Sequence, residues 1–210
     1  MARWLAPSSV PPPAPPAAGD ALMDVARRAA EGDDAATQEV LRAVWPTMTR
    51  VIASVLGSTH PEVDDVLQQS LIGLLRSLSA FRGECHPAGY ASRIALHTAL
   101  RARKRAGFRR ARTEELARLE PEERSHPSPS EEAAGEQRRR VLRDLLSDLP
   151  DEQAEALALR VMLGWTLDEV AAATGAPVNT VRSRVRLAKE ALRRRIESNP
   201  TLADTLGVER

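Results

Sequence analysis

The sequence predicts an all-α protein in which two small helical domains are joined by a flexible linker. Aromatic residues make up 3% of the 210-residue chain, and runs of β-branched residues are scarce, so the composition disfavours strands. Two long stretches instead repeat apolar residues at the three- and four-residue spacing of a helix. Between them lies a segment rich in proline and glutamate, which cannot build a core and therefore indicates a linker.

The N-terminal helical domain is predicted over residues 20–106. Closely spaced prolines in residues 1–19 predict a disordered arm before it. Helices are then expected at about 20–31, 34–56, 61–80 and 88–104. Pro46 should kink or break the second of these helices. The third helix is the clearest, because its apolar residues share one face. They are Val63, Val66, Leu67, Leu71, Leu74, Leu75 and Leu78.

The linker is predicted over residues 107–136, which contain three prolines and many glutamates. The second domain should follow over residues 137–198. Its first two helices are expected at about 138–146 and 151–163, on either side of a Leu-Pro break. Residues 199–210 are interpreted as a frayed tail.

A helix-turn-helix unit is predicted by the stretch GWTLDEVAAATGAPVNTVRSRVRLAKEALRRR. Thr166 and Glu169 form a Thr-x-x-Glu capping box, which begins the first helix. Gly175 permits a sharp turn, because it has no Cβ that would clash at positive φ. Pro177 suits a helix start, so the second helix is expected from about Val178. Such a unit places its second helix in the DNA major groove.

The second helix of this unit carries an apolar stripe beside a basic stripe. The apolar, core-facing stripe consists of Val181, Val185, Ala188 and Leu192. The basic stripe, about 100° further around the axis, consists of Arg182, Arg186, Lys189 and Arg193. The alternative to a DNA-binding surface is a solvated, positively charged helix end, which the helix dipole also favours near a C-terminus.

Charge and composition narrow the class of protein. Lys and Arg number 30 against 29 Asp and Glu, for a net charge of +1. Because basic residues gather at 101–112 and in the last predicted helix, local docking surfaces are expected on an otherwise neutral protein. Cys85 is the lone cysteine, which excludes an intrachain disulfide and favours the reducing cytoplasm.

Several classes of site find no support in the sequence. The four histidines lack metal-ligand spacing, so no metal and no cofactor is expected. No uncharged apolar run approaches the roughly 20 residues of a membrane span, so no membrane insertion is expected. An enzyme is disfavoured, because acidic metal clusters, phosphate-cradling glycine loops and nucleophile–base pairs are all missing; no catalytic residue is expected.

Two separate stretches are similar to one family, the extracytoplasmic-function (ECF) type of bacterial RNA polymerase sigma factors. The C-terminal stretch is LPDEQAEALALRVMLGWTLDEVAAATGAPVNTVRSRVRLAKEALRR. The N-terminal stretch begins at AAEGDDAATQEVL and continues through VDDVLQQSLIGLLRSLSAFRGE to YASRIALHTALRARKR. The resemblance implies a sigma region 2, which binds core RNA polymerase and the promoter −10 element, and then a region 4, which binds the −35 element.

The implied function is promoter-specific transcription initiation, with core RNA polymerase and promoter DNA as partners. An anti-sigma factor is a further partner that the family suggests. The resemblance places the polymerase-binding helix on residues 63–78. Its implied polymerase contacts are Asp64, Asp65, Gln68, Gln69 and Leu71.

The resemblance also implies two sets of DNA contacts. The loop of residues 81–86 would capture a flipped base, and the cations after it would hold the melted strand. The −10 set is Phe81, Arg82, Arg93, His97, Arg101 and Lys104, with Arg103 in the same role. The −35 set is Val178, Asn179, Thr180, Arg182, Ser183, Arg186 and Lys189.

Within the −35 set, Arg182 and Arg186 suit guanine, because a guanidinium fork matches O6 and N7. Lys189, with Arg184 and Arg193 beside the set, suits phosphates.

The chain departs from the family pattern at a few positions. Tyr90 stands where the family usually has tryptophan, Leu96-His97 replaces an Arg-Asn pair, and Pro177 replaces a Ser or Thr. These changes alter the expected DNA sequence rather than the helices. An autonomous helix-turn-helix regulator, with an N-terminal domain for dimerisation or sensing, is the alternative function. Such a regulator binds a palindrome unaided, whereas a sigma factor needs the polymerase.

Overall fold

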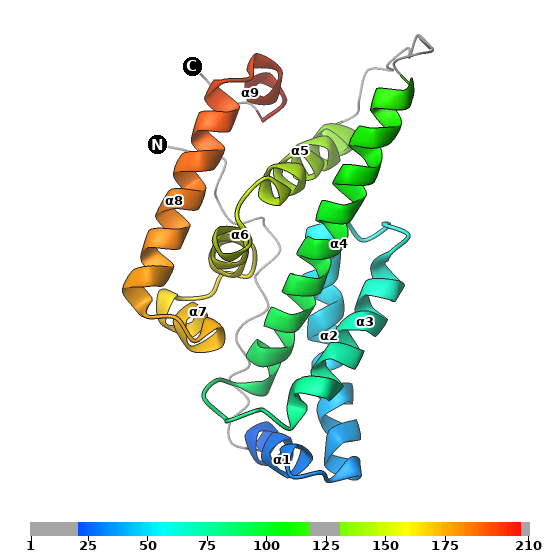
Figure 1. Cartoon of the computed structure of the whole chain (residues 1–210), viewed down its shortest axis with the longest axis vertical. Coiled ribbons are helices and arrows are strands. Elements are labelled where there is room, and N and C mark those ends of the chain that lie inside the picture. The colour runs from blue at the N-terminus through cyan, green and yellow to red at the C-terminus, as the bar shows by residue number, and fades with distance from the viewer. Residues whose placement is uncertain (1–20, 118–130, 207–210) are drawn as a thin grey trace.

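The computed structural model describes residues 21–117 and 131–206, and all its regular elements in these ranges are helices (Figure 1). The predicted all-α class is confirmed. The elements are α1 (Ala21–Ala30), α2 (Asp34–Leu56), α3 (Val63–Leu78), α4 (Pro87–Ala117), α5 (Glu131–Ser147), α6 (Asp151–Leu157), the π-helical turn η2 (Ala158–Met162), α7 (Leu167–Thr174), α8 (Val178–Glu197) and α9 (Pro200–Leu206). The proline-rich arm and the middle of the expected linker lie outside the described residues.

The N-terminal half is a bundle in which α4 packs against α2 and α3. The face of α4 toward this bundle carries small residues, which allow the helix axes to approach closely. They are Ala88, Ala91, Ala95, Ala99 and Ala102, all buried. From α2, Val44, Met48 and Ile52 fill the space opposite and are fully buried. Asp33 caps α2 by accepting a hydrogen bond from the Ala36 backbone N–H at 2.9 Å.

Pro46 does not break α2, which is continuous from Asp34 to Leu56. The predicted break is therefore wrong. Pro46 is exposed, so the carbonyl that loses its helical donor faces water and is not left unsatisfied in the core. The buried residues on either side, including Val44 and Met48, stabilise the helix through tertiary packing.

The apolar face of α3 is narrower than the sequence suggests. Val66, Leu67, Leu74 and Leu78 are buried as predicted, but Leu75 is 45% exposed. One face of a four-turn helix cannot point every one of its apolar residues into the core. The predicted place of Leu75 in the core is wrong.

The two helices that flank the predicted linker over residues 107–136 extend into it, and its bounds stay a prediction. Helix α4 continues to Ala117, and α5 begins at Glu131. Residues 107–117 contain one glycine and no proline among Arg, Ala, Glu and Leu, and these strong helix formers outweigh Gly107. The start of α5 is similarly rich in Glu and Ala.

The C-terminal half contains α5 to α9, with α6 packed on α8. The helix predicted at 151–163 is present as α6 and η2, and its last turn widens so that the Leu163 N–H donates to the Ala158 carbonyl at 3.1 Å. The predicted fraying after Asn199 is wrong for residues 200–206. These form α9, in which Ala203 and Leu206 are buried.

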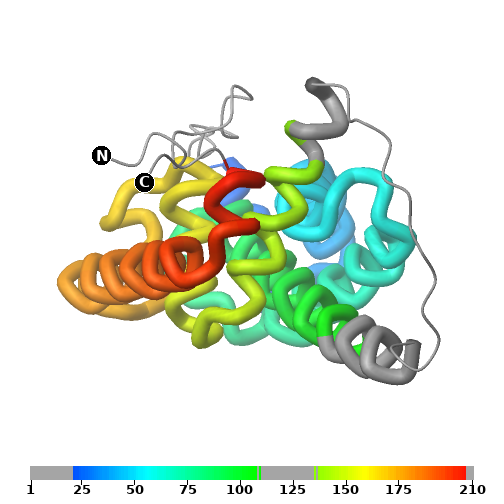
Figure 2. The backbone as a smooth tube through the Cα atoms, turned by 90° about the horizontal axis from the view of Figure 1, so that it is seen from above, coloured from blue at the N-terminus to red at the C-terminus, as the bar shows by residue number. Residues whose placement is uncertain are grey.

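The two halves lie against each other along α4 (Figures 1 and 2). Helix α4 contacts α2 and α3 on one side and α5, α6 and α7 on the other. The buried apolar side chains of the described residues form one contiguous cluster across both halves. The division into domains at residues 20–106 and 137–198 stays a prediction.

Candidate nucleic-acid interface

The helix-turn-helix unit has the predicted local geometry. The Glu169 N–H donates to Thr166 Oγ1 at 3.2 Å, and the Thr166 N–H donates to Glu169 Oε2 at 2.7 Å. Both halves of the capping box are therefore formed. Gly175 ends α7 in the left-handed region at φ 66°, ψ 18°, where a side chain would be strained. Helix α8 begins at Val178, directly after Pro177.

The two stripes of α8 point in the predicted directions. Val181, Val185, Ala188 and Leu192 are buried, which leaves the parallel basic stripe facing outward. The stripe of Arg182, Arg186, Lys189 and Arg193 lines one wall of an open groove. The opposite wall comes from η2 and the start of α7, through Arg160, Val161, Gly164 and Leu167. We call this the basic groove.

Arg160 is a member of the basic groove that sequence reasoning missed. Its side chain donates to the Trp165 carbonyl at 3.0 Å, so it is held near the turn into α7. Sequence spacing gave no signal for it, because the residue is remote from the α8 stripe and only the tertiary fold brings it opposite. With Glu190 as the single acidic residue among those lining it, the basic groove is a strongly cationic surface.

The N-terminal half of α8 presents polar side chains beside the basic groove. Asn179, Arg182 and Ser183 are exposed, and Val178 and Thr180 are half-buried. Arg182 Nη1 donates to Asn179 Oδ1 at 2.6 Å, and Ser183 Oγ donates to the Asn179 carbonyl at 2.9 Å. This end of the helix therefore offers donors and acceptors that can reach base edges.

The other α8 arginines divide into two groups. Arg186 and Arg193 pair with Glu190 and Glu197 one turn on, at 2.7 and 2.6 Å. Such exposed pairs contribute little and exchange readily for phosphate. Arg184 instead points back to Glu152 of α6 at 2.5 Å and is largely covered. This packing contradicts the prediction that Arg184 meets phosphate.

The expected capture loop after α3 is braced by two aromatic rings. The Phe81 and Tyr90 ring centroids lie 5.3 Å apart at an interplanar angle of 58°, a favourable tilted arrangement. Tyr90 Oη also donates to the Ser77 carbonyl at 3.3 Å. Arg82 is exposed at the loop's edge, and Gly83 adopts φ 73°.

The predicted −10 cations of α4 come together on one helix face. Their positions, Arg93, His97, Arg101 and Lys104, follow the spacing of a single face. This face is turned toward the acidic start of α6. Arg93 Nε lies 2.9 Å from Glu155 Oε1, and Lys104 Nζ lies 3.0 Å from Asp151 Oδ1. His97 Nε2 is 3.8 Å from the same Glu155 oxygen, whereas Arg101 is exposed.

Arg103 does not belong to this face, and its predicted contact with the melted strand is wrong. It is buried, with Nη1 donating to the Val55 carbonyl at 3.3 Å. Its Nη2 donates to the Arg140 carbonyl at 3.2 Å and to Asp144 Oδ1 at 2.8 Å. Burial lowers the pKa of the Arg103 guanidinium, and the nearby Asp144 carboxylate partly opposes this effect. Arg103 ties α2, α4 and α5 together.

The predicted polymerase contacts on α3 form an exposed stripe, with one exception. Asp64, Asp65, Gln68 and Gln69 are exposed, while Leu71 is half-buried against the core. Two apolar residues that the sequence analysis did not assign to this surface, Ile72 at 40% and Leu75 at 45%, are exposed two to three turns after Asp65. The sequence could have predicted exposed apolar residues on this helix, because α3 has more apolar residues than one buried face can hold.

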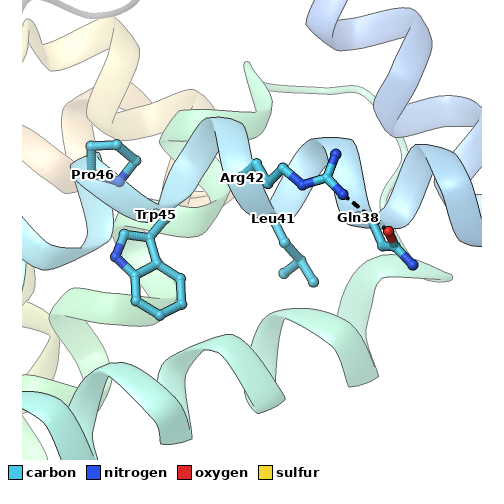
Figure 3. A pocket seen from close by; sticks show the side chains of 5 residues that line it. All are labelled: Gln38, Leu41, Arg42, Trp45 and Pro46. Carbon is cyan, nitrogen blue, oxygen red and sulfur yellow. Dashed lines mark hydrogen bonds between the residues drawn. The ribbon is translucent and has the colours of Figure 1, made fainter.

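A further exposed aromatic residue lies on α2. Trp45 is 50% exposed and lies on the same side of α2 as Leu41, one turn earlier (Figure 3). Together with Gln38, Arg42 and Pro46 they line a shallow pocket. A half-exposed tryptophan is typical of surfaces that bind other proteins.

Other kinds of site are not formed by the part of the chain that the structure describes. Within residues 21–117 and 131–206 no three His, Cys, Asp or Glu side chains gather to hold a metal. No helix in these ranges is long and apolar enough to span a bilayer. Cys85 is half-buried, and this burial raises the pKa of its thiol.

Comparisons with known proteins agree on one family. The Sigma-70 region 2 model matches residues 36–109, and the Sigma-70, region 4 model matches residues 139–192. An ECF RNA polymerase sigma-E factor of Haemophilus influenzae is 30% identical over 143 residues, which cover 65% of this chain and 75% of the relative. The corresponding factor of Salmonella typhimurium is 30% identical over 155 residues, which cover 70% and 81%.

A solved structure supports the fold. In the structure of CnrH in complex with the cytosolic domain of CnrY, the matching chain has 20% sequence identity and a TM-score of 0.51. The match covers 86% of this chain and 99% of that one.

Proposed function

Since the chain belongs to the ECF sigma factors, which direct transcription initiation by bacterial RNA polymerase, we propose a role for each of its exposed surfaces. The basic groove and the start of α8 bind the −35 duplex. The 81–86 loop and the cationic face of α4 bind the melted −10 strand. The exposed stripe of α3 binds core polymerase.

The basic groove supports the −35 assignment, and it is the single observation that carries the proposal. Its cations come from α8 and, through Arg160, from η2 opposite, so they can meet phosphates beside an inserted α8. Arg182 and Asn179 at the helix start are placed to reach base edges, as in other helix-turn-helix proteins. Arg160 adds a phosphate contact to the set.

The loop and the α4 cations support the −10 assignment. Phe81 and Tyr90 brace the loop, and Arg82 is exposed beside it. Single-stranded DNA is held by a cationic track with nearby stacking surfaces rather than by a groove-reading helix. The row from Arg93 to Lys104 is such a track.

The α3 stripe supports the polymerase assignment. It combines the carboxylates and amides of Asp65, Gln68 and Gln69 with the exposed apolar side chains of Ile72 and Leu75. A mixture of apolar anchors with polar neighbours is what a specific protein–protein surface requires. Leu71 contributes by packing beneath this stripe rather than by direct contact.

The remaining roles follow from this assignment. The chain supplies no catalytic residue, since the chemistry of RNA synthesis belongs to the polymerase. It acts in the cytoplasm, where polymerase and promoter DNA are found. An anti-sigma factor is a further partner, supported by the complex of CnrH with the cytosolic domain of CnrY.

The proposal is tested by measuring the binding of a promoter duplex with and without core polymerase. We expect weak binding by the chain alone and stable binding by the complex, because each DNA-binding surface is small and polymerase holds both in place. Tight binding of a palindromic duplex by the chain alone would instead support an autonomous regulator.

A further inference from the structure

The middle of α2 carries an aromatic side chain that the described fold leaves half uncovered. Trp45 is 50% exposed, although the chain has only three tryptophans, and exposed apolar surface of this kind often marks a binding site. Trp45 and Leu41 point to the same side of α2, one turn apart (Figure 3). With Gln38, Arg42 and Pro46 they line the shallow pocket on this helix. The pocket is therefore a candidate docking site.

The polar groups of this pocket are mainly hydrogen-bond donors. The Trp45 indole has a ring N–H, and the Arg42 guanidinium has five N–H groups. Arg42 Nη2 donates to Gln38 Oε1 at 3.1 Å, which holds the guanidinium beside the apolar part of the pocket (Figure 3). None of the described residues that line the pocket is acidic. The pocket thus suits an uncharged ligand that offers apolar surface and carbonyl oxygens.

A proline-rich chain has this chemistry. Proline has a carbonyl oxygen but no N–H donor, and a polyproline II helix leaves its carbonyls free because it has no internal hydrogen bonds. Segments with the spacing Pro-x-x-Pro dock in aromatic-lined grooves, and their stiff backbone loses little entropy on binding. From Gln38 to Pro46 the pocket runs about 12 Å along α2. This length equals about four residues of polyproline II.

Such a segment is present near the start of the same chain. Residues 11–16 are PPPAPP, which contains two overlapping Pro-x-x-Pro patterns, one from Pro12 to Pro15 and one from Pro13 to Pro16. Residues 4–19 contain no charged residue, so no charge has to leave water when the segment covers an apolar surface. The composition of this segment therefore matches the pocket.

The length of chain before α1 also matches. The described residues begin at Ala21, the start of α1, and α1 packs against α2 and lies crosswise to it (Figure 1). The helical rise gives about 15 Å along α1 and about 17 Å from the start of α2 to Trp45, so two such legs set crosswise separate Ala21 from Trp45 by roughly 20–25 Å. Residues 11–16 lie about 15–31 Å of polyproline II chain before Ala21. The proline run can therefore reach Trp45.

We propose that the pocket around Trp45 is a polyproline-binding site whose ligand is residues 11–16 of the same chain. The Trp45 ring packs on proline rings, and its N–H and the Arg42 guanidinium donate to carbonyls of the segment. Because the segment is tethered to α1, its effective concentration at the pocket is in the millimolar range, so a weak contact is enough to keep the pocket occupied. The inference goes beyond the DNA and polymerase assignments and rests on neither.

Acrylamide quenching of tryptophan fluorescence tests the docking. A Trp4→Phe background leaves Trp45 and Trp165, and Trp165 is only 6% exposed, so the quenching reports on Trp45. We expect the quenching constant to rise roughly twofold or more when the prolines of the segment are replaced, because docking at millimolar effective concentration covers Trp45 in most molecules. The full-length serine variant is Pro11→Ser, Pro12→Ser, Pro13→Ser, Pro15→Ser, Pro16→Ser.

The matched control removes prolines from the predicted linker and should be quenched like the parent protein. It is Pro121→Ser, Pro127→Ser, Pro129→Ser. Equal quenching of Trp45 in the parent, the serine variant and the control would overturn the inference. Protection of Trp45 that increases with protein concentration would also overturn it, since the ligand would then be the segment of a second copy.

A titration with a free peptide tests the chemistry of the ligand. A synthetic peptide of residues 7–18, which contains no tryptophan, is added to the full-length serine variant. We expect it to restore the low quenching constant of Trp45, with half of the effect at about 1 mM or below. The same peptide with serine at its five positions in the proline run should have no effect. If the proline peptide leaves the quenching unchanged, or if both peptides act equally, the pocket does not recognise polyproline and the proposal is overturned.

Discussion

At the scale of single residues, Arg182 is the side chain whose role is most sharply defined. It is exposed at the start of α8, and its guanidinium already donates to Asn179 Oδ1 at 2.6 Å. That pairing holds the guanidinium fork over the end of α8 that we propose enters the DNA major groove. A bidentate contact to guanine would then need little further ordering.

Replacing Arg182 with alanine should weaken binding to the −35 element by about 1–3 kcal/mol and relax the preference at one base pair. The measurement is the affinity of the polymerase complex for a panel of −35 variants. Arg194→Ala is the matched control, because it removes the same charge from an exposed position three turns further along α8. An equal loss on every base sequence would show that Arg182 meets phosphate only.

Cys85 should react slowly in the folded protein. Burial raises the pKa of its thiol, with Glu84 adding to the rise and Arg93 opposing it. A raised pKa leaves less thiolate at neutral pH, and the thiolate is the nucleophile. Alkylation by iodoacetamide, followed by mass spectrometry, should be several-fold slower than in urea. A folded protein that reacts as fast as the unfolded one would contradict this burial.

Residue identity alone could not separate the arginines of α4. Arg93, Arg101 and Arg103 have the same chemistry and lie within three turns, so the sequence assigned all of them to DNA. The fold divides them, because Arg101 is exposed whereas Arg103 reaches the Val55 and Arg140 carbonyls in the interior. Which arginine turns inward depends on the partners that α2 and α5 provide, and these lie 37 to 48 residues away.

At the scale of elements, the sequence predicted a helix start or a turn correctly where all the residues that determine it lie close together in the chain. The capping box at Thr166, the turn at Gly175 and the start at Val178 all appear as predicted, because each depends on neighbours within a few residues. The lengths of α4 and α5 and the presence of α9 were not predicted. Ala203 and Leu206 of the last helix are buried, and the sequence of a short segment does not reveal the surface that buries them.

The exposed face of α3 makes a prediction at this scale. Replacing Asp65 and Gln68 with alanine should reduce binding to core polymerase by roughly tenfold or more, as loss of polar contacts at a specific interface does. The helical circular-dichroism spectrum should stay unchanged, since both side chains are exposed. Binding is measured by co-purification or surface plasmon resonance with immobilised core enzyme.

The control for this experiment uses another exposed polar pair of the same bundle. Glu31→Ala, Glu39→Ala, at exposed positions after α1 and on α2, should bind polymerase like the wild type. Normal binding by the α3 variant would remove the assignment of this helix.

At the scale of the whole molecule, the described structure is one body in which α4 lies between two helical groups (Figure 1). The sequence predicted the two groups but not their contact. That contact includes two ion pairs between residues far apart in the sequence, Arg93 with Glu155 and Lys104 with Asp151. The spacing of these charged residues along their helices is equally typical of a solvent-exposed face, so the sequence does not reveal the pairing.

The most direct test of the central claim is run-off transcription with purified core polymerase on genomic promoter fragments. The account predicts that adding the chain produces transcripts from discrete start sites that core polymerase alone does not use. It also predicts that Arg182→Ala lowers their yield, whereas Arg194→Ala does not. If the chain and core polymerase together yield no transcript beyond those of core polymerase alone, the account is contradicted.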